Sequence, residues 1–149
     1  MKLASGSDGT AIVVDVIRFR GGPHEVADTI LRTAQRDGHA VAVGLPQDPG
    51  QAGKQQVAWL SQQLAGFNVV ASPETGAKVT RALPVAALAE AGRLRLLRAA
   101  WNQPLLNELR DFPHGRKDDQ VDALSRGFAM IGQGGRPARR MNVARAVQR

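Results

Sequence analysis

The chain has 149 residues, with 20 Lys or Arg against 13 Asp or Glu, a formal net charge of +7. This length is typical of one domain, and 43% hydrophobic residues are enough for one core, which excludes wholesale disorder. The lack of Cys excludes disulfides, thiolate zinc sites and Cys nucleophiles, and no apolar run approaches the ~18 residues of a membrane span. The charge predicts a polyanionic partner, nucleic acid before membrane, and we expect an intracellular domain.

The first part of the chain predicts two strands, a helix and a third strand. Residues 2–5 and 11–19 are the two strands, and the second (AIVVDVIRF) is rich in β-branched residues. The helix runs from Pro23, a residue suited to a helix start, to the C-capping Gly38. The wholly apolar run 40–45 is typical of a strand buried on both faces.

The rest of the chain continues this alternation up to residue 133. Helices are predicted around 57–64, 81–91, 101–109 and 118–131, and strands or extended segments at 68–71 and 94–97. Residues 134–149 hold five Arg and no acid. We therefore predict a domain over 1–133 followed by a mobile basic tail, 134–149, in which 142–148 is an alternative short helix. Alternating strands and helices indicate an α/β layer architecture.

Three of the few carboxylates lie together at the start of the last predicted helix, at Asp118, Asp119 and Asp122. Asp at a helix start caps free N–H groups and matches the helix dipole, which explains one or two of them. Three carboxylates at this spacing repel each other, and they are the ligands that Mg²⁺ or Mn²⁺ prefers. Helix capping and metal binding both stay open on the cluster alone.

A second candidate carboxylate, Asp48, follows the apolar run 40–45 in a Pro/Gly-rich loop. The carboxyl end of such a strand is where α/β proteins place functional groups, although a turn Asp between two prolines is also common. The following residues do not match the phosphate-binding G-x-x-x-x-G-K-[ST] motif. They predict a Gly-rich turn into a helix, where Lys54 and the free N–H groups can meet a phosphate.

Several short segments resemble, in order and spacing, the C-terminal nuclease domain of the large terminase subunit of tailed bacteriophages. They are LPQDPGQAGK (45–54), KVTRALP (78–84), EAG (90–92), WN (101–102), ELRDFP (108–113) and KDDQVDALS (117–125). The resemblance spans about Ile12 to Phe128. It implies a ribonuclease H-like fold, with a mixed central sheet flanked by helices, and an endonuclease that cuts concatemeric double-stranded DNA during genome packaging.

The resemblance also implies site residues and partners. Members bind two divalent ions, Mg²⁺ or Mn²⁺, and the matching positions are Asp48, Asp118 and Asp119 as catalytic metal ligands, with Asp122 one turn later. The expected DNA-binding residues are Lys54, Lys78, Arg81, Arg116 and Lys117. The partners implied are double-stranded DNA, the terminase ATPase domain, the small terminase subunit and the portal, in the cytoplasm of a bacterial host.

The chain departs from the family at its N-terminus, because no residue matches the metal-binding Asp of the family's first strand. We expect an N-terminally truncated domain that exposes a sheet edge, and such an edge favours a homodimer. Whether the chain is an enzyme is therefore open. The alternatives are a catalytically crippled DNA-binding or packaging-interface module with the same fold, or another ribonuclease H-like enzyme such as a resolvase or transposase core.

Overall fold

The computed structural model describes residues 1–133 and 143–146, which form six strands and five helices. The strands are β1 (Lys2–Ser5), β2 (Ala11–Asp15), β3 (Ala42–Gln47), β4 (Val69–Pro73), β5 (Leu94–Leu96) and β6 (Val143–Ala146). The helices are α1 (Pro23–Asp37), α2 (Gln51–Gln63), α3 (Lys78–Glu90), α4 (Asn102–Asp111) and α5 (Asp119–Gln133). No helix in these ranges is long and apolar enough to cross a membrane.

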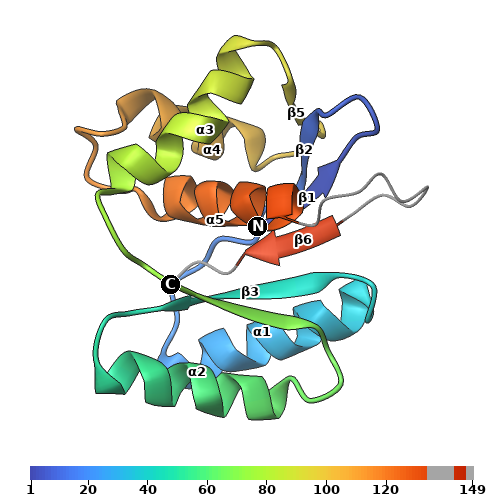
Figure 1. The fold of residues 1–149 in the computed structure, drawn as a ribbon, viewed down its shortest axis with the longest axis vertical. Coiled ribbons are helices and arrows are strands. Elements are labelled where there is room, and N and C mark those ends of the chain that lie inside the picture. The colour runs from blue at the N-terminus through green and yellow to red at the C-terminus, as the bar shows by residue number, and fades with distance from the viewer. Residues whose placement is uncertain (134–142, 147–149) are drawn as a thin grey trace.

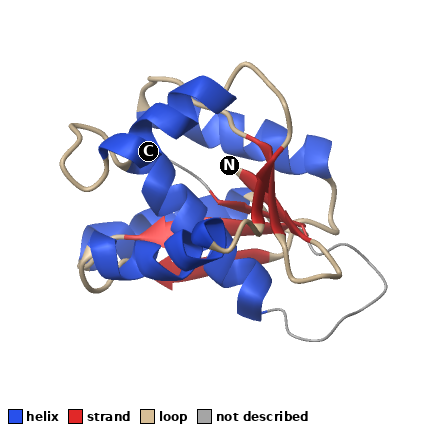
Figure 2. Ribbon diagram, turned by 90° about the horizontal axis from the view of Figure 1, so that it is seen from above, coloured by secondary structure: helices blue, strands red, loops and turns tan. Residues whose placement is uncertain are grey.

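The strands form one mixed sheet in the order β4-β3-β6-β1-β2-β5, with helices on both sides of it (Figures 1 and 2). Strand β1 is antiparallel to β2 and β6, whereas β3 is parallel to β4 and β6, and β2 is parallel to β5. The predicted architecture, a mixed central sheet flanked by helices, is confirmed.

Two hydrophobic clusters stabilise the two sides of the molecule. One joins β1 and β2 to α3, α4 and α5, with Leu3, Leu105 and Leu124 fully buried. The other joins β3 to α1 and α2 around Leu45 and Leu64. Each buried Leu contributes about 1.5–3 kcal/mol relative to an exposed one. The first cluster holds α5 against the sheet and so fixes the acidic start of that helix.

Helix α5 packs very closely on β1 because residue 127 is a glycine. A Cβ at Gly127 would lie 2.7 Å from Cδ1 of Leu3, a distance that real Cβ atoms do not adopt. The predicted strand 11–19 ends at Asp15 in the structure. Its neighbours β1 and β5 have only four and three residues, so the backbone of 16–19 finds no ladder partner in the described sheet.

The described part of the predicted tail is a strand and belongs to the sheet. Strand β6 lies between β1 and β3, pairing Leu3 with Ala144 and Val43 with Arg145 (Figure 1). This corrects both interpretations of that segment, a mobile tail and a short helix over 142–148. Residues 134–142 and 147–149 lie outside the described residues, and the division of the chain into domain and tail as a whole stays a prediction.

The sheet edge that the sequence predicted to be exposed is therefore covered. In the described sheet β1 has a neighbour on both sides, β6 and β2. The prediction failed because pairing between distant segments of a chain leaves no signal in local sequence patterns. The outer strands of the described sheet are β4 and β5.

Candidate functional site

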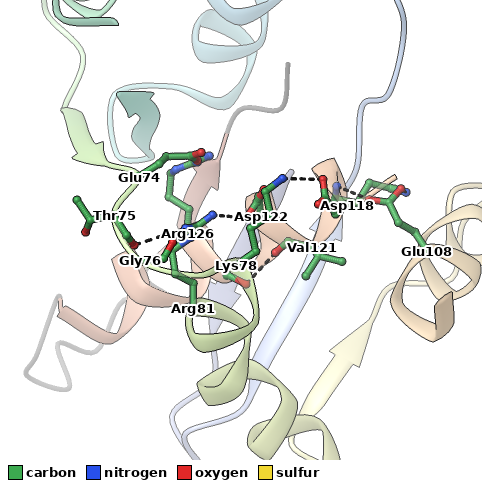
Figure 3. A network of polar contacts seen from close by, with 12 residues as sticks. Glu74, Thr75, Gly76, Lys78, Arg81, Glu108, Asp118, Val121, Asp122 and Arg126 are labelled. Carbon is green, nitrogen blue, oxygen red and sulfur yellow. Dashed lines mark hydrogen bonds and ion pairs between the residues drawn. The ribbon is translucent and has the colours of Figure 1, made fainter. Parts of the chain in front are cut away.

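The acidic start of α5 is the centre of the candidate site. Helix α5 begins at Asp119, and the Asp118 carbonyl accepts the first-turn hydrogen bond from the Asp122 amide at 3.0 Å. Carboxylates here interact favourably with the positive end of the helix dipole, which explains why the helix starts at this point. The side chains of Asp118 and Asp122 lie one turn apart and face α3, as Figure 3 shows.

Two basic side chains from the first turn of α3 neutralise this face of α5. The Lys78 ammonium lies 2.7 Å from Oδ1 of Asp118 and 2.9 Å from Oδ2 of Asp122, and Arg81 lies 2.7 Å from Oδ1 of Asp122 (Figure 3). Hydrogen bonds to Asp118 and then Asp122 raise the pKa of Lys78 above its usual 10.5. The lysine therefore stays charged, and it separates two carboxylates that would otherwise repel each other.

A buried carboxylate from α4 anchors the start of α5 from the other side. Glu108 is 6% exposed; its Oε1 accepts the Gln120 backbone N–H at 2.6 Å and its Oε2 accepts the Gln120 side-chain amide at 2.6 Å. Arg18 lies 3.7 Å from Oε2 of the same carboxylate. Glu108 thus satisfies one of the helix's free N–H groups and sets the position of the neighbouring Asp119.

Asp119 occupies a different environment from its two neighbours. Burial of its carboxyl group is the main cause that raises the pKa of Asp119 above its usual 3.8. Repulsion from Glu108 and Asp118 raises this pKa further. The side chain lines a pocket of about 620 Å³ between the start of α5 and the segment that follows β2. A carboxylate with a raised pKa in a pocket is a common feature of functional sites.

Asp48 directly follows the carboxyl end of β3, beside the carboxyl end of the parallel strand β4. There a hydrogen bond from the Glu74 amide to the Gln47 carbonyl, 3.1 Å long, joins the residues at the ends of the two strands. From these strand ends the carboxylate of Glu74 reaches α5, where it pairs with Arg126 (Figure 3). Glu74 and Asp122 line a second pocket, of about 250 Å³.

These carboxylates do not form a divalent metal site as they are arranged. No group of three or more His, Asp or Glu side chains in residues 1–133 and 143–146 is placed to hold a metal ion. The assignment of Asp48, Asp118 and Asp119 as metal ligands therefore stays a prediction. In this arrangement Lys78 and Arg81 already pair with the carboxylates of Asp118 and Asp122.

The predicted DNA-binding residues fall into three places. Lys78 and Arg81 are ion-paired on α3, Arg116 and Lys117 line the pocket of Asp119, and Lys54 is exposed on α2. Sequence reasoning missed Glu74, Glu108 and Arg18. Two of them carried a usable signal: Glu74 directly follows a strand parallel to β3, and Glu108 opens the segment ELRDFP that resembles the terminase family. What the site residues do stays a prediction.

A comparison with protein-family models agrees with this geometry. The model described as the terminase RNaseH-like domain matches residues 3–130 of the chain. The chain belongs to this family. Searches of the curated proteins and of the solved structures returned no match. The terminase domain therefore has a ribonuclease H-like fold, which the mixed sheet and its flanking helices confirm, and the family match favours a terminase over a resolvase or transposase core.

Proposed function

We propose that this chain is the nuclease domain of a terminase large subunit, a metal-dependent endonuclease that cuts concatemeric double-stranded DNA during genome packaging. The observation that carries the proposal is the start of α5, where Asp118, Asp119 and Asp122 lie among basic side chains. Carboxylates are ligands for hard divalent cations, and Lys and Arg pair with DNA phosphates. Family membership supports the same proposal.

The ion pairs limit how active the isolated domain is expected to be. Metal-assisted phosphodiester cleavage needs carboxylates that are available to cations. In this chain Asp118 and Asp122 are held by Lys78 and Arg81, and no group of three or more carboxylates among the described residues is placed to hold a metal ion. We therefore expect feeble nicking, stronger with Mn²⁺ than with Mg²⁺, because Mn²⁺ demands less ideal geometry and binds such sites more tightly.

The same ion pairs favour a second candidate function. A domain whose carboxylates are already neutralised by its own cations can bind DNA, or a packaging partner, without cutting. In this case the fold serves as a DNA-binding or packaging-interface module. The ATPase domain, the small terminase subunit and the portal are the partners proposed for either function, in the cytoplasm of a bacterial host.

Nicking of a supercoiled plasmid separates the two functions. The endonuclease proposal expects slow conversion to the nicked form with Mn²⁺, weaker conversion with Mg²⁺, and none with EDTA or in the Asp119→Ala variant. Binding to the plasmid with no nicking in Mn²⁺ would favour the second function. Rapid cleavage with Mg²⁺ would contradict the expected weakness and would show that a complete metal centre forms on DNA.

A further inference from the structure

The pocket beside Asp119 carries a concentration of positive charge, of which the expected DNA-binding residues account only for Arg116 and Lys117. Two segments form it: the stretch after β2, with Arg18 and Arg20, and the loop before α5, with Arg116 and Lys117. Asp119 is the one acidic residue in its lining. The pocket thus gathers four basic side chains around one carboxylate.

Most of these cations have no carboxylate of their own. In the part of the chain that the structure describes, the ion pairs include none to Arg20, Arg116 or Lys117, and Arg18 lies 3.7 Å from the buried Glu108. By contrast, Lys78 and Arg81 on the other side of α5 are fully engaged with Asp118 and Asp122. Like charges held together without counter-ions repel each other, so their arrangement calls for an external anion.

We propose that this pocket binds the phosphodiester backbone of DNA and guides one strand past the start of α5. The proposal rests on the proposed function, and it assigns Arg18 and Arg20 to DNA binding alongside Arg116 and Lys117. The pocket volume of about 620 Å³ lies within the range of ~300–1,000 Å³ typical of small-ligand sites and admits a sugar–phosphate segment. Phe19, 45% exposed between the two arginines, gives the pocket an apolar wall that fits a deoxyribose ring.

The pocket binds phosphate groups rather than bases. Arg and Lys side chains from two segments surround it, and contacts of this kind position a duplex without reading its sequence. A backbone held here passes directly over Asp119, the carboxylate that the pocket shares with the start of α5. Binding is thus expected to be independent of sequence and strongly dependent on salt, because every phosphate contact releases counter-ions.

The test compares two double variants that remove equal charge. Arg20→Gln/Arg116→Gln takes one unpaired cation from each wall of the pocket, and Arg32→Gln/Arg98→Gln removes two exposed arginines that do not line it. Binding of a short duplex DNA is measured over a range of salt concentrations. The logarithm of the association constant falls as the logarithm of the salt concentration rises. The pocket variant should make this negative slope shallower by about 1.8, at about 0.9 per lost phosphate contact, and the control should leave it nearly unchanged.

Equal losses of slope in the two variants would overturn the proposal, because the effect would then come from net charge alone. A wild-type slope retained in the pocket variant would overturn it as well. Both results leave the nuclease proposal standing, since nicking is scored separately. Failure of the wild-type chain to bind DNA would instead refute the proposed function.

Discussion

Lys78 has the most consequential side-chain contacts at the start of α5, because one ammonium group bridges Asp118 and Asp122. Removing it leaves two carboxylates one turn apart, and among the described residues the remaining ion pair to them is that of Arg81 with Asp122. The Lys78 side chain is 45% exposed, so solvent screens the bridge. Its contribution to the free energy of unfolding is therefore about 1 kcal/mol rather than the larger value of a buried pair.

We expect Lys78→Met to lower the free energy of unfolding by about 1 kcal/mol at neutral pH. The folded-state pKa of Lys78 is raised, so its stabilisation is fully present below pH 10.5 and is lost as the pH rises through the folded value. The difference between variant and wild type should therefore stay constant from neutral pH and shrink above pH 10.5. Urea unfolding at several pH values measures it.

The control for this prediction is Lys54→Met, which removes the same charge from an exposed position on α2. It should leave stability within about 0.5 kcal/mol of the wild type at every pH. A Lys78→Met variant that is as stable as this control would show that the bridge contributes nothing to folding.

At the scale of single elements, the loop from β3 to α2 depends on close packing at Gly53. A Cβ there would lie 2.9 Å from the Asp48 carbonyl carbon, and closer still to the carbonyl oxygen, with the rigid backbone unable to yield. Gly53, which lies in the predicted Gly-rich turn into a helix, therefore has a packing role. It lets the loop carrying Asp48 fold tightly onto the first turn of α2.

Gly53→Ala should destabilise the domain by about 1–3 kcal/mol, as overpacking does in a crowded site. Gly132→Ala in α5 is the matched control, because a Cβ there meets nothing within 4 Å. Alanine in place of glycine in an open helix position should keep stability equal or raise it by up to ~1 kcal/mol. Thermal unfolding of both variants measures the effects, and equal melting temperatures would refute the packing argument.

On the scale of the whole molecule, β6 joins the two halves of the sheet. Strands β1 and β2 lie on one side of it and β3 and β4 on the other, each half with its own hydrophobic cluster. Removing β6 would leave the backbone groups of β1 and β3 that face it without partners, and such edges pair with other chains.

A chain ending at Gln133 is therefore expected to unfold at lower denaturant concentration and to self-associate. Light scattering after size-exclusion chromatography and urea unfolding test this. The control keeps the full length and replaces four arginines outside β6 by Gln: Arg136, Arg139, Arg140 and Arg149. It should keep the oligomeric state and stability of the wild type, and a truncated chain that behaves identically would show that β6 is dispensable.

The excess of arginine in the C-terminal segment also predicts a contribution to DNA binding, and the four-arginine variant tests it. Weaker binding with a flatter salt slope in the four-arginine variant would assign that contribution to its charges, without any change to the sheet. An unchanged slope in this variant would assign DNA binding to the rest of the domain.

Local patterns in the sequence determined the elements and the family of this protein. The apolar run 40–45 indicated a buried strand, and Pro23 and Gly38 marked the ends of a helix that the structure places over 23–37. The concentration of Asp118, Asp119 and Asp122 located the acidic helix start. These features depend on backbone preferences and hydrophobic periodicity within short segments, which a sequence displays directly.

Only the tertiary structure decided what surrounds that helix start. The cations that pair with Asp118 and Asp122 come from about 40 residues earlier in the chain, 41 residues in the case of Arg81 and Asp122. Strand β6 enters the sheet beside β1 from the opposite end of the sequence. Such contacts are set by how the two hydrophobic clusters pack, and no local pattern specifies that packing. The sequence therefore identified the acidic residues. The tertiary structure alone determined that two of them pair with lysine and arginine and that the third lies in a basic pocket.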